Sequence, residues 1–562
     1  MKNMDEEELY HEFYISSVKL DPQIFDIYPL DFPKLKNHFP SEFNYKTVYP
    51  NYLSDQYDVE NKTIISTFIK KAKTLELLYP ESLNLKVFIF YLENDLDSYN
   101  YPFDLLPIDH KNNPYSYITE ESSGDGYYTF VNEQDYIDYI KRMREFQIYS
   151  DTIRMKMRIG CEKNITLPRI IVEKTIKQLQ KIIKSKAYHN KNASKYYPNF
   201  NMEMDNIFGI EIKKTISFLK DEYIDHSRKT LGYCFINPEM YKYCVRTNVT
   251  DNDIKVEDIY QIGLKEIHKI DKEMMSVLGQ LLKKNFKGRS DYINERTKYE
   301  KDPKNVFQTS AEVLDTYNKI RKDIQDTVIK PYFGNIKISH DYQIRPVPDH
   351  SVDNESAYYY PANQNLTRKG TFYLNVANPE KLSKNEVLAL SLHEGNPGHH
   401  FQLTYKLDNM KKLPEYLKIY DGLTAYVEGW GLYVETLGNY EKSKGLYQKY
   451  GQLKMEMLRS LRLVLDTGIH YYGWTLNRAR QYYMKYLSDD IDNIDRELLR
   501  YVVDPGQALA YKMGQLSFLR MQKRYLEDGL LLKQYHQKCF EKGELPLYLF
   551  EEVLEKEIKI KF

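Results

Sequence analysis

The sequence predicts a mostly α-helical protein with one small β element in its second half. Apolar residues recur at spacings of three and four over long stretches from about residue 135 onward, as they do in helices that bury one face. Residues 356–376 combine β-branched and aromatic residues between turn residues, which is typical of short strands. The chain has 562 residues and is 42% hydrophobic, so it is long enough to bury a large core.

We expect three successive regions. Residues 1–130 are rich in Tyr, Pro, Asn and Asp, which predicts short helices and ordered loops packed on the rest of the protein. Residues 131–330 are expected to form a helical domain, and residues 331–562 a second one that carries the candidate site. The expected helices are Asp135–Ile159, Leu167–Ser185, Val256–Phe286, Ala311–Ile329, Gly422–Gly438, Tyr447–Tyr472, Asn477–Leu487 and Gly506–Leu526, and the expected strands are Ser356–Pro361 and Gly370–Val376.

Composition excludes several classes of protein. Lys+Arg and Asp+Glu both number 80, whereas nucleic-acid-binding proteins gain affinity from a basic excess. No stretch approaches the ~18–20 uninterrupted apolar residues of a membrane span. The first eight residues are acidic, unlike a secretory signal, and the four cysteines lack CxxC spacing. We therefore expect a cytoplasmic protein that binds neither nucleic acid nor membrane, with its oligomeric state left open.

The candidate site starts from the segment His393–His400, which reads HEGNPGHH. Two histidines four residues apart on a helix can hold one zinc ion, and a Glu directly after the first can act as general base. Glu394 follows His393 here, but the position four residues after His393 is Pro397, which cannot bind a metal and disrupts a helix. An unbroken helix would therefore form no metal site.

Pro397 and Gly398 could interrupt the helix and so bring a second histidine beside His393. If these two residues bulge out of the helix, His399 returns to the place that a regular helix gives to the fourth residue. A bulge of three residues would select His400 instead. We favour His399 as the second metal ligand and keep His400 as the alternative.

A zinc site of this kind needs a third protein ligand, and the helix expected around residues 424–435 offers two carboxylates. Glu428 and Glu435 are seven residues apart and therefore share one face of that helix. The small residues Gly429 and Gly431 indicate close packing against another helix. We predict Glu428 as the ligand and Glu435 as the residue that orients a ligand histidine. The expected cofactor is one Zn²⁺ ion, although other divalent transition metals suit a His₂Glu set.

Two later segments add candidate residues. Arg462, Asp466 and His470 are spaced four apart, which predicts an ion pair between the first two and places the histidine on the same helix face. Residues 504–506 are expected to open a helix that carries Tyr511. Because a Tyr hydroxyl or a His N–H can stabilise a developing oxyanion, His470 and Tyr511 are predicted catalytic residues. Arg462 is also a candidate for contacting the substrate.

Together these motifs resemble the DUF885 family. The segments that carry the resemblance are HEGNPGHHFQ (His393–Gln402), EGWGLYVE (Glu428–Glu435), RLVLDTGIHYYGWT (Arg462–Thr475), DPGQALAYKMGQ (Asp504–Gln515), YYYPANQN…KGTFYLNVANP (Tyr358–Pro379) and a region within Leu231–Ile267. That family is similar to the gluzincin-type zinc metallopeptidases. The resemblance implies a large helical metallopeptidase-like fold, with residues 331–562 as its metal-binding catalytic domain.

The resemblance also implies roles for individual residues. The metal set would be His393, His399 or His400, and Glu428, with Glu394 as general base. Tyr373–Val376 would be an edge strand that holds a peptide backbone by β-addition, so that Tyr373 and Asn375 contact the substrate.

These inferences predict a zinc-dependent hydrolase that cleaves peptide bonds, with short peptides or small amides as substrates in a cleft. In the expected mechanism Glu394 accepts the proton of the attacking water, and His470 and Tyr511 hold the oxyanion. Two alternatives remain. One is a metal-dependent hydrolase of non-peptide amides or esters, and the other is an inactive homologue that acts as an interaction protein.

Overall fold

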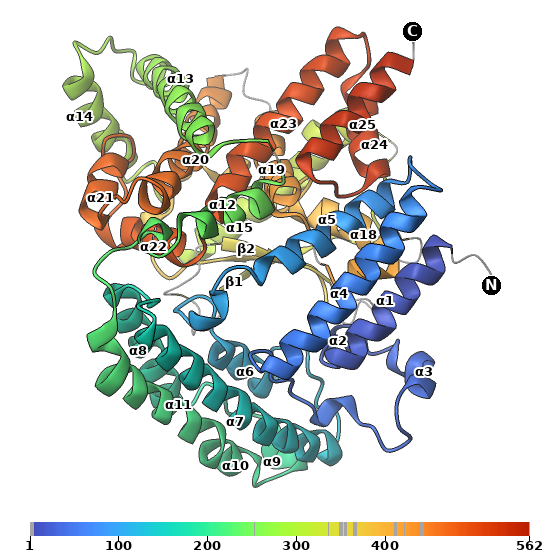
Figure 1. The fold of residues 1–562 in the computed structure, drawn as a ribbon. Coiled ribbons are helices and arrows are strands. Elements are labelled where there is room, and N and C mark those ends of the chain that lie inside the picture. Colours follow the sequence, from blue (N-terminus) through green and yellow to red (C-terminus); the bar gives the residue numbers. More distant parts are fainter. Residues whose placement is uncertain are drawn as a thin grey trace. The chain divides into compact units, whose positions relative to one another are not determined.

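A computed structural model describes residues 5–251, 253–334, 336–347, 352, 357–362, 368–409, 413–420, 422–438 and 443–560. The chain divides into two compact units. Unit 1 consists of Met1–Leu231 and Pro414–Asp421, and unit 2 of Gly232–Leu413 and Gly422–Phe562. The predicted fold class is confirmed, because both units are built mainly of helices (Figure 1). In the described ranges no helix has both the length and the apolar composition that a membrane crossing requires.

Unit 1 is helical throughout its described part. Its α-helices are α1 (Glu6–Leu20), α2 (Ile24–Ile27), α3 (Phe32–Leu35), α4 (Asp55–Glu76), α5 (Leu83–Ser98), α6 (Pro114–Ser123), α7 (Glu133–Glu162), α8 (Arg169–Ser185), α9 (Ala193–Tyr196), α10 (Phe200–Asn206) and α11 (Phe208–Phe218). Helices α1, α4 and α5 are longer than the short helices expected for this region. Two of the five buried residues of α1 are Tyr10 and Tyr14, and a residue with both an apolar ring and a hydroxyl obscures helical periodicity.

The expected boundary at residue 130 is absent, because α7 packs on the segment before it. The buried Arg142 of α7 donates hydrogen bonds to the carbonyls of Tyr45 and Lys46. Its guanidinium also pairs with Asp26 at 2.6 Å. A buried guanidinium needs several partners, and all of these come from the first 50 residues. Residues on both sides of position 130 therefore belong to one unit.

Unit 2 carries the helices that follow. They are α12 (Pro238–Val249), α13 (Val256–Leu282), α14 (Arg289–Glu300), α15 (Ser310–Ile324), α16 (Lys330–Phe333), α17 (Val387–Glu394), α18 (His399–Asn409), α19 (Thr424–Val434), α20 (Ser443–His470), α21 (Leu476–Met484), α22 (Ile491–Val503), α23 (Gln507–Glu527), α24 (Leu532–Lys542) and α25 (Leu547–Ile560). Helix α13 packs along α20, and α19 along α23. A Cβ built on Gly429 of α19 would lie 2.4 Å from the Cα of Gly514 in α23, so the close packing predicted for α19 is confirmed.

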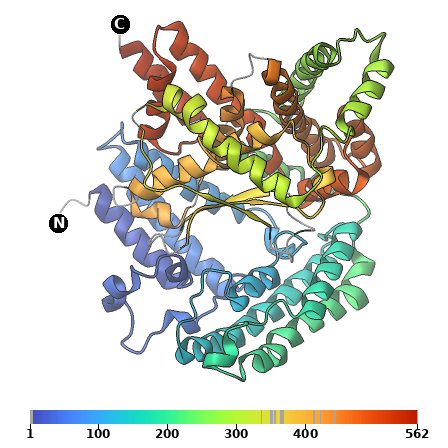
Figure 2. The same cartoon turned by 180° about the vertical axis from the view of Figure 1, so that it is seen from behind.

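A three-stranded sheet precedes the helices of the candidate site (Figure 2). Its strands are β1 (Gln343–Pro346), β2 (Ala357–Tyr360) and β3 (Thr371–Leu374), in the order β1-β3-β2. Strand β1 pairs with β3 in parallel, and β2 pairs with β3 antiparallel. The side chains of Phe372 and Leu374 are buried beneath α15, in a cluster that includes Tyr317 and Val387. The two predicted strands are thus confirmed as β2 and β3, whereas the four-residue β1 was missed.

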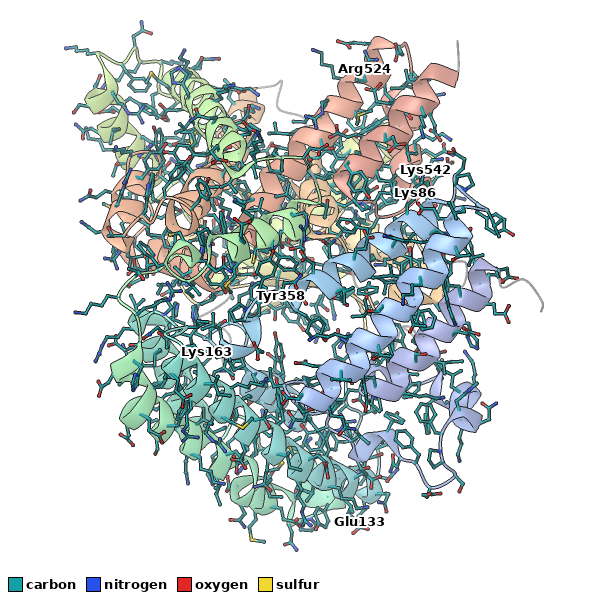
Figure 3. The ribbon with its side chains drawn as sticks, viewed as in Figure 1. Lys86, Glu133, Lys163, Tyr358, Arg524 and Lys542 are labelled. Carbon is teal, nitrogen blue, oxygen red and sulfur yellow. The ribbon has the colours of Figure 1, made fainter. Side chains whose placement is uncertain are left out.

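The predicted edge strand is wrong, because β3 is the central strand. Tyr373 pairs in register with Arg345 on one side and with Tyr358 on the other, so both hydrogen-bonding edges of β3 are occupied. The ring of Tyr358, labelled in Figure 3, stacks on that of Tyr373 with centroids 5.0 Å apart. The side-chain amide of Asn375 donates to the carbonyl of Val352. This arrangement removes the basis for β-addition at Tyr373 and Asn375, since β3 has no open edge to which a peptide strand could be added.

Candidate metal centre

The helix that carries His393 stops where the sequence required a break. Helix α17 ends at Glu394, and α18 begins at His399. A Cβ on Gly398 would lie 1.8 Å from the carbonyl oxygen of His393, so only glycine allows the chain to turn back over the end of α17. The indole Nε1–H of Trp430 donates to the carbonyl of Pro397 at 2.8 Å, which ties the turn to α19. The predicted interruption at Pro397 and Gly398 is therefore confirmed.

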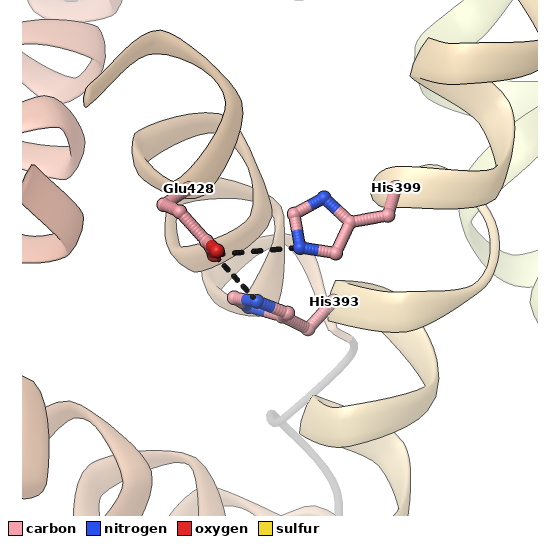
Figure 4. Close-up of side chains that lie close together, drawn as sticks. All are labelled: His393, His399 and Glu428. Atoms are coloured by element: carbon pink, nitrogen blue, oxygen red, sulfur yellow. Dashed lines mark ion pairs between the residues drawn. The ribbon is translucent and has the colours of Figure 1, made fainter. Parts of the chain in front are cut away.

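The break brings His399 beside His393 (Figure 4). The Nε2 atoms of His393 and His399 each lie 3.4 Å from Oε2 of Glu428 in α19. One nitrogen from each histidine and one carboxylate oxygen all lie within 4.8 Å of one another. Ligand atoms bound at ~2.0–2.1 Å around a tetrahedral zinc ion are separated by roughly 3.3 Å, so the two measured distances match such a site.

The electrostatics of the three residues also suit a cation. Burial alone would lower the pKa of His393, but the neighbouring carboxylates of Glu428 and Glu435 raise it to about 10. Burial would raise the pKa of Glu428, whereas His399 and His393 hold it well below its usual value. The carboxylate is therefore ionised beside two imidazoles, where a metal ion can replace the shared proton.

Unsatisfied buried atoms give a second test of the fit. Oε2 of Glu428, which points at both imidazoles, has no hydrogen-bond partner within the described part of the chain, and neither has Nδ1 of His399. Orphaned buried polar atoms cost free energy unless a ligand or water engages them. The donor set of two imidazoles and one carboxylate is one that binds zinc with a further position open. The residues present therefore fit a metal ion.

Gly431 in α19 and Glu435, which directly follows this helix, orient the ring of His393. Its Nδ1–H donates to Oε1 of Glu435 at 2.9 Å, which leaves Nε2 to face Glu428. Gly431 lies directly under the imidazole, because a Cβ at this position would meet Cε1 at 2.8 Å and both ring nitrogens at 3.0 Å. The structure thus gives Glu435 the orienting position that the sequence predicted, and it places Gly431, for which the sequence indicated only close helix packing, beneath the imidazole.

Glu394 ends α17 directly after His393. Its residue is buried, with 7% of its surface exposed, and no hydrogen bond or ion pair engages its carboxylate among the described residues. An unengaged carboxylate next to a metal ligand is available to accept a proton. The position agrees with the role of general base that the sequence predicted.

His400 is held apart from this cluster. Its Nδ1 lies 2.9 Å from the hydroxyl of Tyr359, and its Nε2 lies 3.2 Å from the carbonyl of His340. Burial, together with the nearby His340, lowers the pKa of His400 to about 3, so the imidazole is neutral. Both of its nitrogens are thus engaged by neighbours other than His393 and Glu428. Of the two alternatives, the geometry favours His399.

Tyr511 reaches the cluster from α23. Its ring stacks on the imidazole of His393, with centroids 6.4 Å apart and an interplanar angle of 13°. The guanidinium of Arg462 lies 4.5 Å from the centroid of the Tyr511 ring, and Nη2 of Arg500 donates to the Tyr511 hydroxyl at 3.0 Å. The structure thus brings Tyr511 and Arg462, both predicted from sequence, to the side of the candidate metal ligands.

The comparisons with known proteins agree with this description. The family model described as "Bacterial protein of unknown function (DUF885)" matches residues 45–554. The chain belongs to the DUF885 family. None of the curated proteins compared with it is a match.

Two solved structures share the fold of this DUF885 chain. One is a "putative lipoprotein" from Colwellia psychrerythraea, with a TM-score of 0.82 and 19% identity over 98% of each chain. The other is a "putative lipoprotein of unknown function" from Shewanella oneidensis, with a TM-score of 0.71 and 16% identity over 98% of this chain and 100% of that chain. At these identities the likeness establishes the fold.

His470 lies in a different environment from the one predicted. Its Nδ1 accepts the backbone N–H of Tyr233 at 3.2 Å, and its Nε2–H donates to the carbonyl of Tyr501 at 2.8 Å. The ring of Tyr241 stacks on the imidazole, which is completely buried. With both nitrogens bound to backbone groups, His470 has no N–H left for an oxyanion. We therefore give it a structural role and withdraw the catalytic one.

The predicted ion pair between Arg462 and Asp466 is also wrong. Asp466 accepts hydrogen bonds from the Tyr241 hydroxyl at 2.6 Å and from the backbone N–H of Gly506 at 3.1 Å. Arg462 instead pairs with Glu497 at 3.0 Å. Gly506 caps α23, so its N–H has no acceptor within that helix, and Asp466 supplies one.

Sequence reasoning missed two residues beside the cluster, Arg459 and Arg500, and the contact of Gly431 with the His393 ring. Arg459 has its Nη2 atom 4.0 Å from Oε1 of Glu435, and its guanidinium lies 6.0 Å from the centroid of the Tyr511 ring. A helical pattern does contain a signal for Arg459, because it stands three residues before Arg462 and on the same face of α20. Arg500 belongs to α22, and the packing of α22 against the next helix, α23, brings it to Tyr511, eleven residues later.

Proposed function

We propose that this chain is a zinc-dependent peptidase of gluzincin-like design. The observation that carries the proposal is the convergence of His393, His399 and Glu428 on one point, with Glu394 next to the first ligand. His₂Glu sets with an adjacent Glu are typical of metal-dependent hydrolysis of peptide bonds.

The three ligands would hold the ion, and Glu435 would fix the tautomer and direction of the His393 ring through its 2.9 Å hydrogen bond. A zinc ion bound there would polarise the substrate carbonyl and lower the pKa of water to about 7. Glu394 would accept the proton of the attacking water and then deliver it to the leaving amine, which requires a carboxylate without other partners.

Tyr511 would stabilise the oxyanion that develops on the carbonyl. Its hydroxyl oxygen accepts a hydrogen bond from Arg500, so its own hydrogen remains to be donated. A preorganised donor of this kind contributes on the order of 10²–10³ in kcat. His470 is not part of the proposed mechanism.

The proposal is tested by metal content and hydrolysis measured on the same preparation. The purified protein should contain about one zinc ion per chain by elemental analysis and cleave members of a peptide library, and a chelator should abolish the cleavage. Glu394→Gln should keep the zinc and lose about 10²–10⁴-fold in kcat. As a matched control, Glu551→Gln, on the surface pair with Arg520, should keep both zinc and activity.

Each alternative gives a different result in this experiment. If the protein cleaves esters or non-peptide amides but no peptides, it is a metal-dependent hydrolase of those compounds and not a peptidase. Absence of zinc together with absence of turnover in the wild-type protein would refute the proposal and favour an interaction protein. Full activity of Glu394→Gln would refute the assigned base.

The site of action is a separate question. The cytoplasmic location stays a prediction, and both solved neighbours are described as a "putative lipoprotein". If the chain were anchored in the same way, its peptide substrates would lie outside the cytoplasm. Fractionation of cells that express the tagged full-length protein distinguishes the two locations.

A further inference from the structure

Two arginines beside the candidate metal centre have unused buried hydrogen-bond donors. Nε of Arg459 and Nη1 of Arg462 are buried and have no hydrogen-bond partner within the described ranges. The two residues are 9% and 4% exposed. Leaving a buried charged donor without a hydrogen bond is costly in free energy, so these N–H groups call for an acceptor.

Both guanidinium groups lie against the same ring. Arg459 and Arg462 are three residues apart in α20 and therefore share one helix face. Their guanidinium carbons lie 6.0 and 4.5 Å from the centroid of the Tyr511 ring. That ring in turn stacks on His393 with centroids 6.4 Å apart. The Arg462 guanidinium is thus within ~11 Å of the imidazole, the length of about three extended residues.

The positive charge around Tyr511 is only partly balanced by its hydrogen-bonded neighbours. Arg462 pairs with Glu497, and burial would raise the pKa of that carboxyl, but Arg462 and Arg500 lower it to about 2. Arg459 approaches Glu435 only at 4.0 Å, and Glu435 already accepts the hydrogen bond of His393. A ligand anion would therefore improve both the charge balance and the hydrogen bonding of this cluster.

We propose that Arg459 and Arg462 bind a carboxylate of the substrate beside Tyr511, so that the site selects peptides with a free carboxylate close to the bond that is cleaved. This inference rests on the proposed peptidase function. Guanidinium groups suit the task, because their planar N–H pairs match the two oxygens of a carboxylate. The carboxylate is either the C-terminus of the peptide or an acidic side chain, and both present the same chemistry.

The test measures binding separately from cleavage. Zinc-loaded Glu394→Gln protein is dialysed to equilibrium against N-acetylated tetrapeptide pools, and the retained peptides are quantified by mass spectrometry. One pool has neutral side chains and a free C-terminus, a second has the same side chains and a C-terminal amide, and a third is amidated but contains one Asp. We expect the free acid to be retained ~10–100-fold more than the neutral amide, as for a hydrogen-bonded charge pair.

Variants then assign the preference to the two arginines. Arg459→Gln and Arg462→Gln should each reduce the ratio of acid to amide towards one, while Arg520→Gln, which removes an exposed arginine from α23, should leave it unchanged. If Arg462→Gln fails to fold, Arg462→Lys keeps a charge beside Glu497 but cannot form the paired hydrogen bonds, and it should also reduce the ratio. The acid-to-amide ratio is also measured in Glu394→Gln protein that keeps both arginines, so the inference can be tested even if no arginine variant folds.

The outcomes separate this inference from the proposed function. Preferential retention of the free acid identifies the C-terminus as the carboxylate, and preferential retention of the Asp pool identifies an acidic side chain. Equal retention of all three pools, or retention of none, would overturn the inference. Wild-type protein that cleaves acid and amide peptides at equal rates would leave the peptidase standing without carboxylate selection. Carboxylate-dependent binding without cleavage by the wild-type protein would support the carboxylate site and refute the peptidase function.

Discussion

A single methyl group added at Gly431 should displace the ring of His393. A Cβ at this position would lie 2.8 Å from Cε1 of the imidazole and 3.0 Å from both ring nitrogens, inside van der Waals contact. The ring cannot move freely, because Glu435 holds its Nδ1 and Tyr511 stacks on it. In Gly431→Ala either the imidazole or the backbone of α19 must therefore shift.

The size of the effect follows from this geometry. Overpacking of a buried site by one methyl group costs about 1–3 kcal/mol in the free energy of unfolding. A histidine that loses its orientation lowers metal affinity on the order of 10–100-fold. We expect Gly431→Ala to fold, to unfold at a lower temperature, and to bind zinc at least tenfold more weakly in competition with a chromogenic chelator.

A matched control lies two residues earlier in the same helix. Gly429→Ala adds the same methyl group against the backbone of Gly514 instead of the His393 ring. It should lower the stability of the protein while leaving the zinc affinity of the folded fraction within about twofold of wild type. Wild-type zinc affinity in Gly431→Ala would refute the assignment of His393 as a ligand in this orientation.

Three further changes test other contacts. Glu435→Gln should weaken zinc binding on the order of 10–100-fold, measured by chelator competition, because a neutral amide holds His393 less firmly. Tyr511→Phe should keep the zinc affinity and lower kcat about 10²-fold, and an unchanged kcat would exclude the hydroxyl from the reaction. Burial raises the pKa of Asp466 to about 7 despite the hydrogen bond from Tyr241, so the folded state keeps a proton that the unfolded state loses above about pH 4. Stability should therefore fall as pH rises from 4 to 7, and urea unfolding should show Asp466→Asn gaining up to ~4 kcal/mol on wild type over that interval, whereas a constant difference would contradict the shift.

Helical periodicity predicted several of the longer helices well. The expected helices Leu167–Ser185 and Gly506–Leu526 lie within two residues of α8 and α23 at each end. In α8 periodicity works because Ile, Val and Leu form most of the buried face. In residues 1–130 the signal is weaker, because α4 buries only four of its 22 residues and α5 buries the consecutive residues 87–90, which show no helical period. Strand β1 was missed because four residues ending in Pro346 form too short a pattern.

The local part of the site was predictable, and the part assembled through space was not. Pro397 stands four residues after His393, where a regular helical zinc motif has its second histidine, so the helix had to break there. Gly398 provided the backbone freedom for the break. The predicted ion pair of Arg462 with Asp466 was wrong because the spacing rule behind it considers only contacts within one helix. In the folded unit Asp466 accepts a hydrogen bond at the start of α23, and Arg462 pairs with Glu497 of α22. Residue spacing within α20 cannot predict either contact, because both partners belong to other helices.

The broken helix has a consequence for how the centre is held together. In an unbroken helix with histidines four apart, the helix itself sets the separation of the two imidazoles. Here that separation depends on the turn before His399, which Trp430 fixes from α19, and the direction of His393 depends on Glu435 and Gly431 of the α19 segment. The segment that supplies the third candidate ligand, Glu428, therefore also positions the other two. Helix α19 also packs closely on α23 where Gly429 meets Gly514, so the element that aligns the three residues is itself held in the core of unit 2.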